Sequence, residues 1–205
     1  MKFTLHISRK AVIIVFLLQM VITCGCNSPK VRSDYWHVRD GQIYPPASVG
    51  NEPRYFIGTN FWYGVILASE GEGGDRERLH RELDTLCAMG VDNLRILVGA
   101  DGTDGTHSKV EPTLQKAPGV YDETLLRALD YLMVELGRRN MSAVLYLNNA
   151  WEWSGGFGQY LMWAGEPPCP IPLIDGGDAY MDYMVRFQRN EEAKALFRSY
   201  VADIV

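Results

Sequence analysis

Apolar and polar positions follow a repeating pattern along the chain, in which a short apolar run precedes a longer stretch with helical spacing. Three such runs, at residues 54–61, 93–98 and 142–147, are β-prone and predict strands. The runs are nearly continuous in apolar residues and alternate with helical stretches, which is typical of a parallel sheet covered by helices. We therefore expect an α/β fold with about three strand–helix units.

Each of the first two predicted strands is followed by a helix whose start is marked by an aspartate. Asp75 begins a helix that ends at Gly90, and Asp122 begins a second helix after the loop of residues 99–119. The apolar face of the first helix consists of Leu79, Leu83, Leu86 and Cys87. The apolar face of the second consists of Leu125, Leu129, Leu132 and Leu136. This spacing places Cys87 in the core, where cysteine behaves as a small apolar residue.

A long segment, residues 148–177, follows the third predicted strand and is rich in tryptophan, glycine and proline. Loops of this length usually carry function rather than merely connecting elements. A further helical stretch begins near Asp178, pauses around Asn190 and restarts at Glu191. Its apolar positions continue to Val205 without a residue that typically ends a helix.

The alternation of strands and helices fits either an open doubly wound sheet or a (β/α)8 barrel. In both folds ligands bind beyond the carboxyl ends of the strands, where the loops that begin at Trp62, Gly99 and Asn148 meet. No phosphate-binding glycine motif follows any predicted strand, which makes a nucleotide enzyme a poor fit and favours the barrel. A complete barrel typically uses roughly 250 residues, and the chain has 205.

The N-terminus has the pattern of an export signal. Its first 26 residues contain three basic side chains and no acid, and an apolar stretch at 11–23 is too short for a stable membrane-spanning helix. The stretch runs into Cys24-Gly25-Cys26, which resembles the lipobox of bacterial lipoproteins. We expect Cys26 to carry the lipid. The alternative is an ordinary cleaved signal with two incidental cysteines.

These observations divide the chain into three segments. We predict a lipoprotein signal peptide at residues 1–25, a polar tether at 26–39 and a truncated barrel domain at 40–205. The protein is accordingly expected to be exported and held to a bacterial membrane by its lipid, at the cell surface or in the periplasm. Without the lipid it would be secreted.

Composition narrows the classes of partner. Hydrophobic residues make up 47% and charged residues 22% of the chain, which is typical of a globular protein. The formal charge is −5, and phosphate binding needs a basic face, so we expect no nucleic-acid partner. Cys87 and Cys169 are too few for a disulfide framework. The four histidines are scattered and no Cys/His cluster has zinc spacing, so we expect no metal.

Aromatic residues gather in the predicted loops after the first and third strands. They are Trp62, Tyr63, Trp151, Trp153, Phe157, Tyr160 and Trp163. Flat aromatic faces beside Asn148, Asn149 and Glu152 suit the apolar faces and the hydroxyls of sugars. The alternative interpretation is that the rings only pack the loop.

Charged residues near the strand ends offer few candidates for chemistry. Arg95 lies within an apolar strand and must meet an acid or another acceptor, either as a structural ion pair or to orient a catalytic carboxylate. Glycoside hydrolysis needs a pair of carboxyl groups, one on each side of the scissile bond. The acids at strand ends are Asp101, Asp104 and Glu152, and none has an obvious partner in the sequence.

Several separate motifs, in order, resemble the N-terminal half of β-mannanases of glycoside hydrolase family 5. They are Tyr55-Phe56-Ile57-Gly58-Thr59-Asn60-Phe61-Trp62-Tyr63-Gly64, Gly73-Gly74-Asp75-Arg76-Glu77-Arg78, Asn93-Leu94-Arg95-Ile96-Leu97, Asn148-Asn149-Ala150-Trp151 and Gly155-Gly156-Phe157-Gly158-Gln159-Tyr160. The resemblance extends from about residue 40 to the end of the chain. It implies a (β/α)8 barrel that hydrolyses β-1,4-mannosidic bonds within mannan, glucomannan or galactomannan, with retention and without a cofactor.

The resemblance also assigns roles to single residues. Arg95 matches the arginine beside the nucleophile, and Trp151 matches a tryptophan that lines a sugar subsite. Trp62 and Trp153 are further candidates for substrate binding. The resemblance implies two catalytic glutamates at the ends of the fourth and seventh strands, and only three strand–helix units are recognisable here. Asn51-Glu52-Pro53 matches the acid/base tripeptide by composition but precedes the first strand, so we expect it to have no catalytic role.

We therefore expect the sequence to be the front part of a longer enzyme, inactive alone and without catalytic residues of its own. One rival interpretation is a non-catalytic surface lipoprotein that binds glycans. Sugar-binding modules usually have many short strands in a sandwich rather than strands alternating with long helices. The other rival is a complete open-sheet enzyme, which would need a usable carboxylate pair or phosphate loop within these residues.

Overall fold

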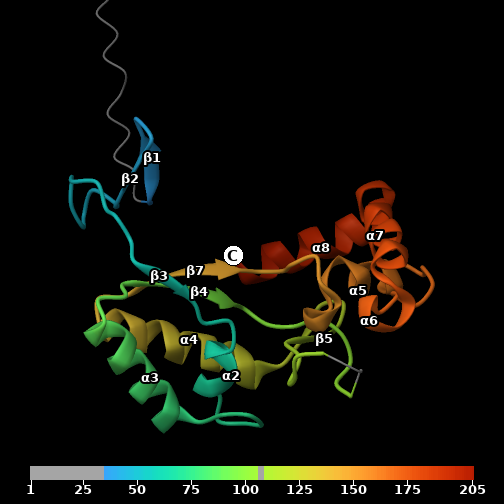
Figure 1. Cartoon of the computed structure of the whole chain (residues 1–205), viewed down its shortest axis with the longest axis horizontal. Helices are drawn as coiled ribbons and strands as arrows, with labels where there is room; N and C mark the ends of the chain where they lie inside the picture. Colours follow the sequence, from blue (N-terminus) through green and yellow to red (C-terminus); the bar gives the residue numbers. More distant parts are fainter. Residues whose placement is uncertain (1–34, 106–108) are drawn as a thin grey trace, which may run out of the picture. The chain divides into compact units, whose positions relative to one another are not determined.

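The computed structural model describes residues 35–105 and 109–205, which form parts of two compact units, Met1–Tyr55 and Phe56–Val205. The predicted signal peptide and Cys26 lie outside the described residues. Figure 1 shows the elements of both units, with colours that follow the sequence. In the described part of the chain, no helix is both long enough and apolar enough to cross a membrane.

The first unit contains a short antiparallel hairpin. Its strands are β1 (His37–Arg39) and β2 (Gln42–Tyr44). Asp40 and Gly41 both have positive φ angles, 51° and 73°, which two-residue hairpin turns of the Asp-Gly type require. The exposed Glu52 of the Asn-Glu-Pro tripeptide also belongs to this unit.

The second unit is built on a three-stranded parallel sheet, whose strand order is β3-β4-β7. The strands are β3 (Gly58–Asn60), β4 (Asn93–Leu97) and β7 (Ser142–Tyr146), each shorter than its predicted run but within it. Asn60 pairs with Arg95 across the first ladder, and Arg95 pairs with Val144 across the second. Sequential strands are therefore neighbours and their carboxyl ends lie at one edge.

Helices cover one face of this sheet (Figure 1). They are α2 (Gly64–Ala68), α3 (Arg76–Ala88) and α4 (Glu123–Arg138). Both predicted N-caps are confirmed, because Asp75 accepts a hydrogen bond from the Arg78 amide at 2.8 Å and Asp122 accepts one from the Thr124 amide at 2.9 Å. Fully buried leucines fill the layer between helices and sheet, among them Leu79, Leu83, Leu94, Leu132 and Leu136.

The prediction that Cys87 lies in the core is wrong. Cys87 is exposed, and its thiol lies 3.9 Å from the Arg139 carbonyl oxygen near the end of α4. Residues eight apart on a helix differ in direction by about 80°, so Cys87 has turned away from the line of Leu79 and Leu83. Leu86 and Leu129, which were also predicted on the apolar faces, are half-buried and pack against the core.

The segment after β7 is largely helical and not the continuous loop expected from its composition. It contains η1 (Glu152–Ser154), α5 (Gly156–Trp163) and α6 (Pro172–Asp175). The helical stretch predicted to begin near Asp178 is confirmed, as α7 (Gly177–Val185) and η2 (Arg186–Arg189). The predicted pause at Asn190 is confirmed, because its side chain caps α8 (Glu191–Ile204) by accepting from the Ala193 amide at 2.9 Å. A small hairpin of β5 (Gln115–Ala117) and β6 (Val120–Tyr121) lies within the loop that follows β4.

Candidate functional site

A cleft of about 350 Å³ lies at the carboxyl ends of the three parallel strands. It is lined by Asn60, Trp62, Arg95, Tyr146 and Trp153. Asn60 and Tyr146 are the last residues of β3 and β7, while Trp62 follows β3 and Trp153 belongs to η1. The strand ends and their loops thus bring together side chains that are up to 93 positions apart in the sequence.

Arg95 lies in this cleft without an acidic partner among the described residues. Its neighbours on β4, Leu94 and Ile96, are fully buried on the helix side, so strand alternation turns Arg95 to the opposite, open face. There its guanidinium donates to the Asn60 side-chain oxygen at 3.4 Å and lies over the Tyr146 ring, 3.7 Å from the centroid. The prediction that Arg95 meets a hydrogen-bond acceptor is confirmed, but the side chain is exposed and not buried within the strand.

Two of the predicted sugar-binding tryptophans form one wall of the cleft. The rings of Trp62 and Trp153 meet edge to face, with centroids 5.8 Å apart and an interplanar angle of 66°. Trp62 is 40% exposed and Trp153 is half-buried. Trp151 is 51% exposed but does not line this cleft; its ring stacks on Tyr180 of α7 instead.

Four of the seven aromatic residues considered for sugar binding instead belong to the core or pack against it. Phe157 stacks on Phe187 with centroids 4.3 Å apart, and Tyr160 is fully buried. Trp163 packs edge to face against Tyr160. Tyr63 donates to Glu82 of α3 at 2.8 Å. Three of these residues were assigned to a loop because α5 was not recognised, and the helical period of α5 turns its rings into the core.

Asp101 is the polar centre that joins the loops around the cleft. Its carboxylate accepts from the Asn148 side chain at 3.0 Å and from the Tyr160 hydroxyl at 3.2 Å. The backbone amide of Asp101 donates to the Ser154 carbonyl oxygen at 2.9 Å, and the Lys109 ammonium donates to the Asp101 carbonyl oxygen at 3.2 Å. These contacts tie the end of β4 to the loop after β7 and to α5.

The surroundings of Asp101 favour its protonated form. The side chain is 1% exposed, and burial raises the pKa of its carboxyl from 3.8 to about 8. The hydrogen bond from Tyr160, the charge of Lys109 and the hydrogen bond from Asn148 act in the opposite direction and offset burial only in part.

Glycine at position 155 permits the loop to approach this centre closely. Gly155 has a φ of +83°, and a Cβ there would lie 2.1 Å from the Asp101 carbonyl oxygen. Any side chain would therefore collide with backbone. The sequence motif contains this glycine, but the contact it permits is visible only in the structure.

The other acidic candidates do not line the cleft. Asp104 accepts from the Thr113 amide at 2.8 Å and pairs with Lys116 at 3.4 Å. Glu152 has one carboxylate oxygen, Oε2, that is buried and has no hydrogen-bond partner among the described residues. No carboxylate of residues 35–105 or 109–205 lines the cleft, and no group of three or more potential metal ligands occurs among them.

Comparison with known proteins identifies the family to which this fold and cleft belong. Residues 42–205 match the family model described as GH family 5 beta-mannosidase-like. The chain belongs to glycoside hydrolase family 5. A solved family 5 mannosidase from Rhizomucor miehei is 31% identical to the chain and superposes with a TM-score of 0.73, over 81% of this chain and 40% of its own. The fold is therefore part of a (β/α)8 barrel, as the sequence predicted.

Curated sequences point to the same family. Putative mannan endo-1,4-beta-mannosidase 9 from Oryza sativa subsp. japonica is 32% identical over 57% of this chain and 26% of its own length. Putative mannan endo-1,4-beta-mannosidase 5 from the same organism is 29% identical over 76% of this chain and 28% of its own length. The chain thus spans less than a third of the length of these two relatives.

The raised pKa of Asp101 predicts a specific dependence of stability on pH. Between pH 4 and pH 8 the folded protein holds a proton on Asp101 that the unfolded chain releases, so this residue lowers stability as pH rises through that window. The Asp101→Asn variant cannot titrate there. We expect the unfolding free energy of the wild type to fall relative to that of Asp101→Asn, by on the order of 1 kcal/mol per pH unit, in urea titrations from pH 4 to 9.

Asp104 provides a control of opposite sign. Burial alone would raise the pKa of Asp104, but the hydrogen bonds from Thr113 and Lys116 outweigh burial and lower it. Asp104→Asn should therefore be less stable than the wild type at neutral pH, and this difference should disappear only in acid.

The result that would contradict the Asp101 prediction concerns the pH dependence of the unfolding free energy. If this dependence is the same for the wild type and for Asp101→Asn, Asp101 is not held protonated in the folded protein.

Proposed function

We propose that the chain is the N-terminal part of an endo-acting glycoside hydrolase that cleaves β-1,4-mannosidic bonds in mannans with retention. The observation that carries this proposal is the cleft itself, where Trp62, Trp153, Asn60 and Arg95 meet at the carboxyl ends of the strands. Membership of family 5 and the similarity to mannan endo-1,4-beta-mannosidases support the choice of mannan. Aromatic faces stack on sugar rings, and the amide and guanidinium can bind their hydroxyls.

In this proposal Arg95 acts on the reacting centre. Its guanidinium is held by Asn60 and Tyr146 and faces the open side of the sheet. A cation in that position would keep a neighbouring nucleophilic carboxylate ionised and oriented. We propose that the carboxylate and its acid/base partner come from strands other than β3, β4 and β7, because no acid among the described residues lines the cleft.

A mannosidase that acts on short mannosides is a second candidate. The Rhizomucor miehei family 5 protein, which was also solved with mannosyl-fructose, is a mannosidase and shares 31–32% identity with the chain. Solved endo-mannanases are less similar, for example the Thermotoga petrophila enzyme at 22% identity with a TM-score of 0.51, and that likeness shows the fold alone.

We also propose that Cys26 is lipidated and anchors the protein to a bacterial membrane. The support is the sequence pattern at Cys24-Gly25-Cys26 and the short apolar stretch before it. A lipid anchor would hold the cleft near the cell, where released sugars can be taken up.

The first test concerns binding without hydrolysis. We expect the 205-residue chain to bind mannotetraose weakly, seen as a change in tryptophan fluorescence, and to release no reducing sugar from mannan. Trp153→Ala should weaken the binding about three- to tenfold by removing one ring of the wall. Trp36→Phe, a change in the first unit, is the matched control and should leave the binding unchanged.

Two results would count against this proposal. Release of mannooligosaccharides above a blank would show that the 205 residues already contain a working carboxylate pair. Wild-type binding that Trp153→Ala does not weaken would place the sugar somewhere other than the cleft.

The second test separates the two modes of action. In an enzyme that contains this chain together with the remaining strands, endo cleavage should lower the viscosity of a mannan solution early, before much mannose appears. A mannosidase would release mannose first and leave viscosity nearly unchanged. Predominant mannose at low conversion would therefore replace the endo proposal by the second candidate.

The third test concerns the anchor. Cells that express the chain should incorporate a fatty-acid probe into it, and Cys26→Ser should abolish the label because the thiol that accepts the lipid is gone. Cys24→Ser is the control two residues away and should keep the label. Labelling of Cys26→Ser at the wild-type level would show that the lipid is elsewhere or absent.

A further inference from the structure

Trp151 stacks on Tyr180, a residue that belongs to none of the motifs found in the sequence. Its ring and that of Tyr180 are parallel, with an interplanar angle of 0° and centroids 5.7 Å apart. This distance is typical of offset stacking between aromatic rings. Tyr180 is 1% exposed, whereas Trp151 is 51% exposed and keeps part of its surface open to solvent.

Tyr180 also holds the backbone that carries Trp151. Its hydroxyl donates to the carbonyl oxygen of Ala150, the residue before Trp151. The Trp151 amide in turn donates to the Asn149 side-chain oxygen at 2.7 Å, which closes a local turn. Both the ring and the backbone of Trp151 are thus fixed, which lowers the entropy cost of presenting the ring to a ligand.

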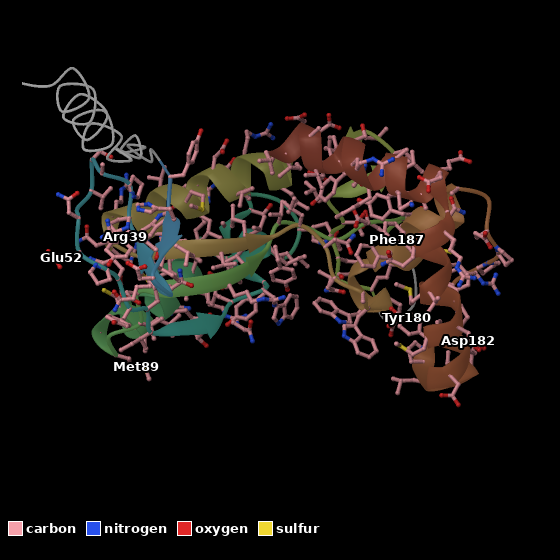
Figure 2. The ribbon with its side chains drawn as sticks, turned by 90° about the horizontal axis from the view of Figure 1, so that it is seen from above. Arg39, Glu52, Met89, Tyr180, Asp182 and Phe187 are labelled. Carbon is pink, nitrogen blue, oxygen red and sulfur yellow. The ribbon has the colours of Figure 1, made fainter. Side chains whose placement is uncertain are left out.

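The position of Tyr180 is set by α7 and not by the loop itself. Figure 2 shows Tyr180 on the inner side of α7 and Asp182 on its outer side. One turn further on, Tyr183 is also buried and donates to the Pro167 carbonyl oxygen at 2.6 Å. Burial raises the pKa of Tyr180 well above its ordinary range, so its hydroxyl remains a hydrogen-bond donor at all physiological pH values.

We propose that Tyr180 is a positioning residue that sets the angle and rigidity of Trp151 as a stacking surface for a mannose unit. This inference rests on the proposed function and on the resemblance that assigns Trp151 to a sugar subsite, which would lie outside the cleft lined by Trp62 and Trp153. The inference adds that α7, through Tyr180, affects the affinity of the Trp151 ring for sugar. No residue of the segment between β7 and α8 belongs to the parallel sheet. Loss of Tyr180 would leave Trp151 in place in the chain but free to change rotamer.

The test uses the full chain labelled with fluorotryptophan, which gives one fluorine resonance for each of its five tryptophans. The Trp151→Phe variant identifies the resonance of Trp151. Tyr180→Leu removes both the stacking and the hydrogen bond, whereas Tyr180→Phe keeps the ring and removes only the donor. Tyr183→Phe is the matched control, because it removes a hydrogen bond from the same helix that does not reach Trp151.

We expect Tyr180→Leu to shift or broaden the Trp151 resonance and to weaken mannotetraose binding about three- to tenfold. Tyr180→Phe should change both readouts in the same sense and less strongly, while Tyr183→Phe should change neither. Thermal melts identify a variant that fails to fold, and if Tyr180→Leu does so, Tyr180→Phe decides. An unchanged Trp151 resonance in a folded Tyr180 variant overturns the proposal.

The same measurements separate this inference from the proposed function. If the wild type binds mannotetraose and folded Tyr180 variants bind it equally well, the positioning role is wrong and the function stands. If the wild type does not bind mannotetraose, the proposed function is wrong, and so is the role of Trp151 in stacking on mannose. The Trp151 resonance still shows whether Tyr180 fixes the position of the ring.

Discussion

The parallel pairing of β4 with strands on both sides is the constraint on which the rest of the second unit depends. Because side chains alternate along a strand, the same five residues place Leu94 and Ile96 among the helices and Arg95 in the cleft. The strand then leads into Asp101, which joins the neighbouring loops through buried hydrogen bonds. The single strand β4 therefore contributes side chains to the core and to the cleft, and it leads to the residue that supports the neighbouring loops.

Local signals in the sequence predicted most of the fold. Aspartate or asparagine at a helix start needs only residues two or three positions away, which is why the caps at Asp75, Asp122 and Asn190 were predictable. The aromatic, glycine-rich segment was harder, because α5 has apolar residues on several sides and resembles a loop in composition. The position of Cys87 was predicted wrongly because this residue lies about 80° around the helix from Leu79, away from the buried line of Leu79 and Leu83.

The candidate site was predictable in part. Arg95, Trp62 and Trp153 were assigned to the site by the family resemblance, and the structure brings all three into one cleft. Their partners were not predictable, since Asn60 and Tyr146 contact Arg95 from other strands. The network of Asp101 links positions 47 and 59 residues apart, which no spacing rule relates.

The close contact between Gly155 and the Asp101 backbone limits which changes the loop after β7 can accept. The carbonyl of Ser154 receives the Asp101 amide, and the next residue touches the Asp101 carbonyl, so two backbones meet without intervening side chains. Substitutions at Trp153 alter the wall of the cleft and leave that junction intact. Insertions or deletions between the end of β7 and Gly155 would shift the junction itself. Residues of this loop can therefore change in identity without disturbing the junction, whereas a change in the length of the loop before Gly155 would displace it.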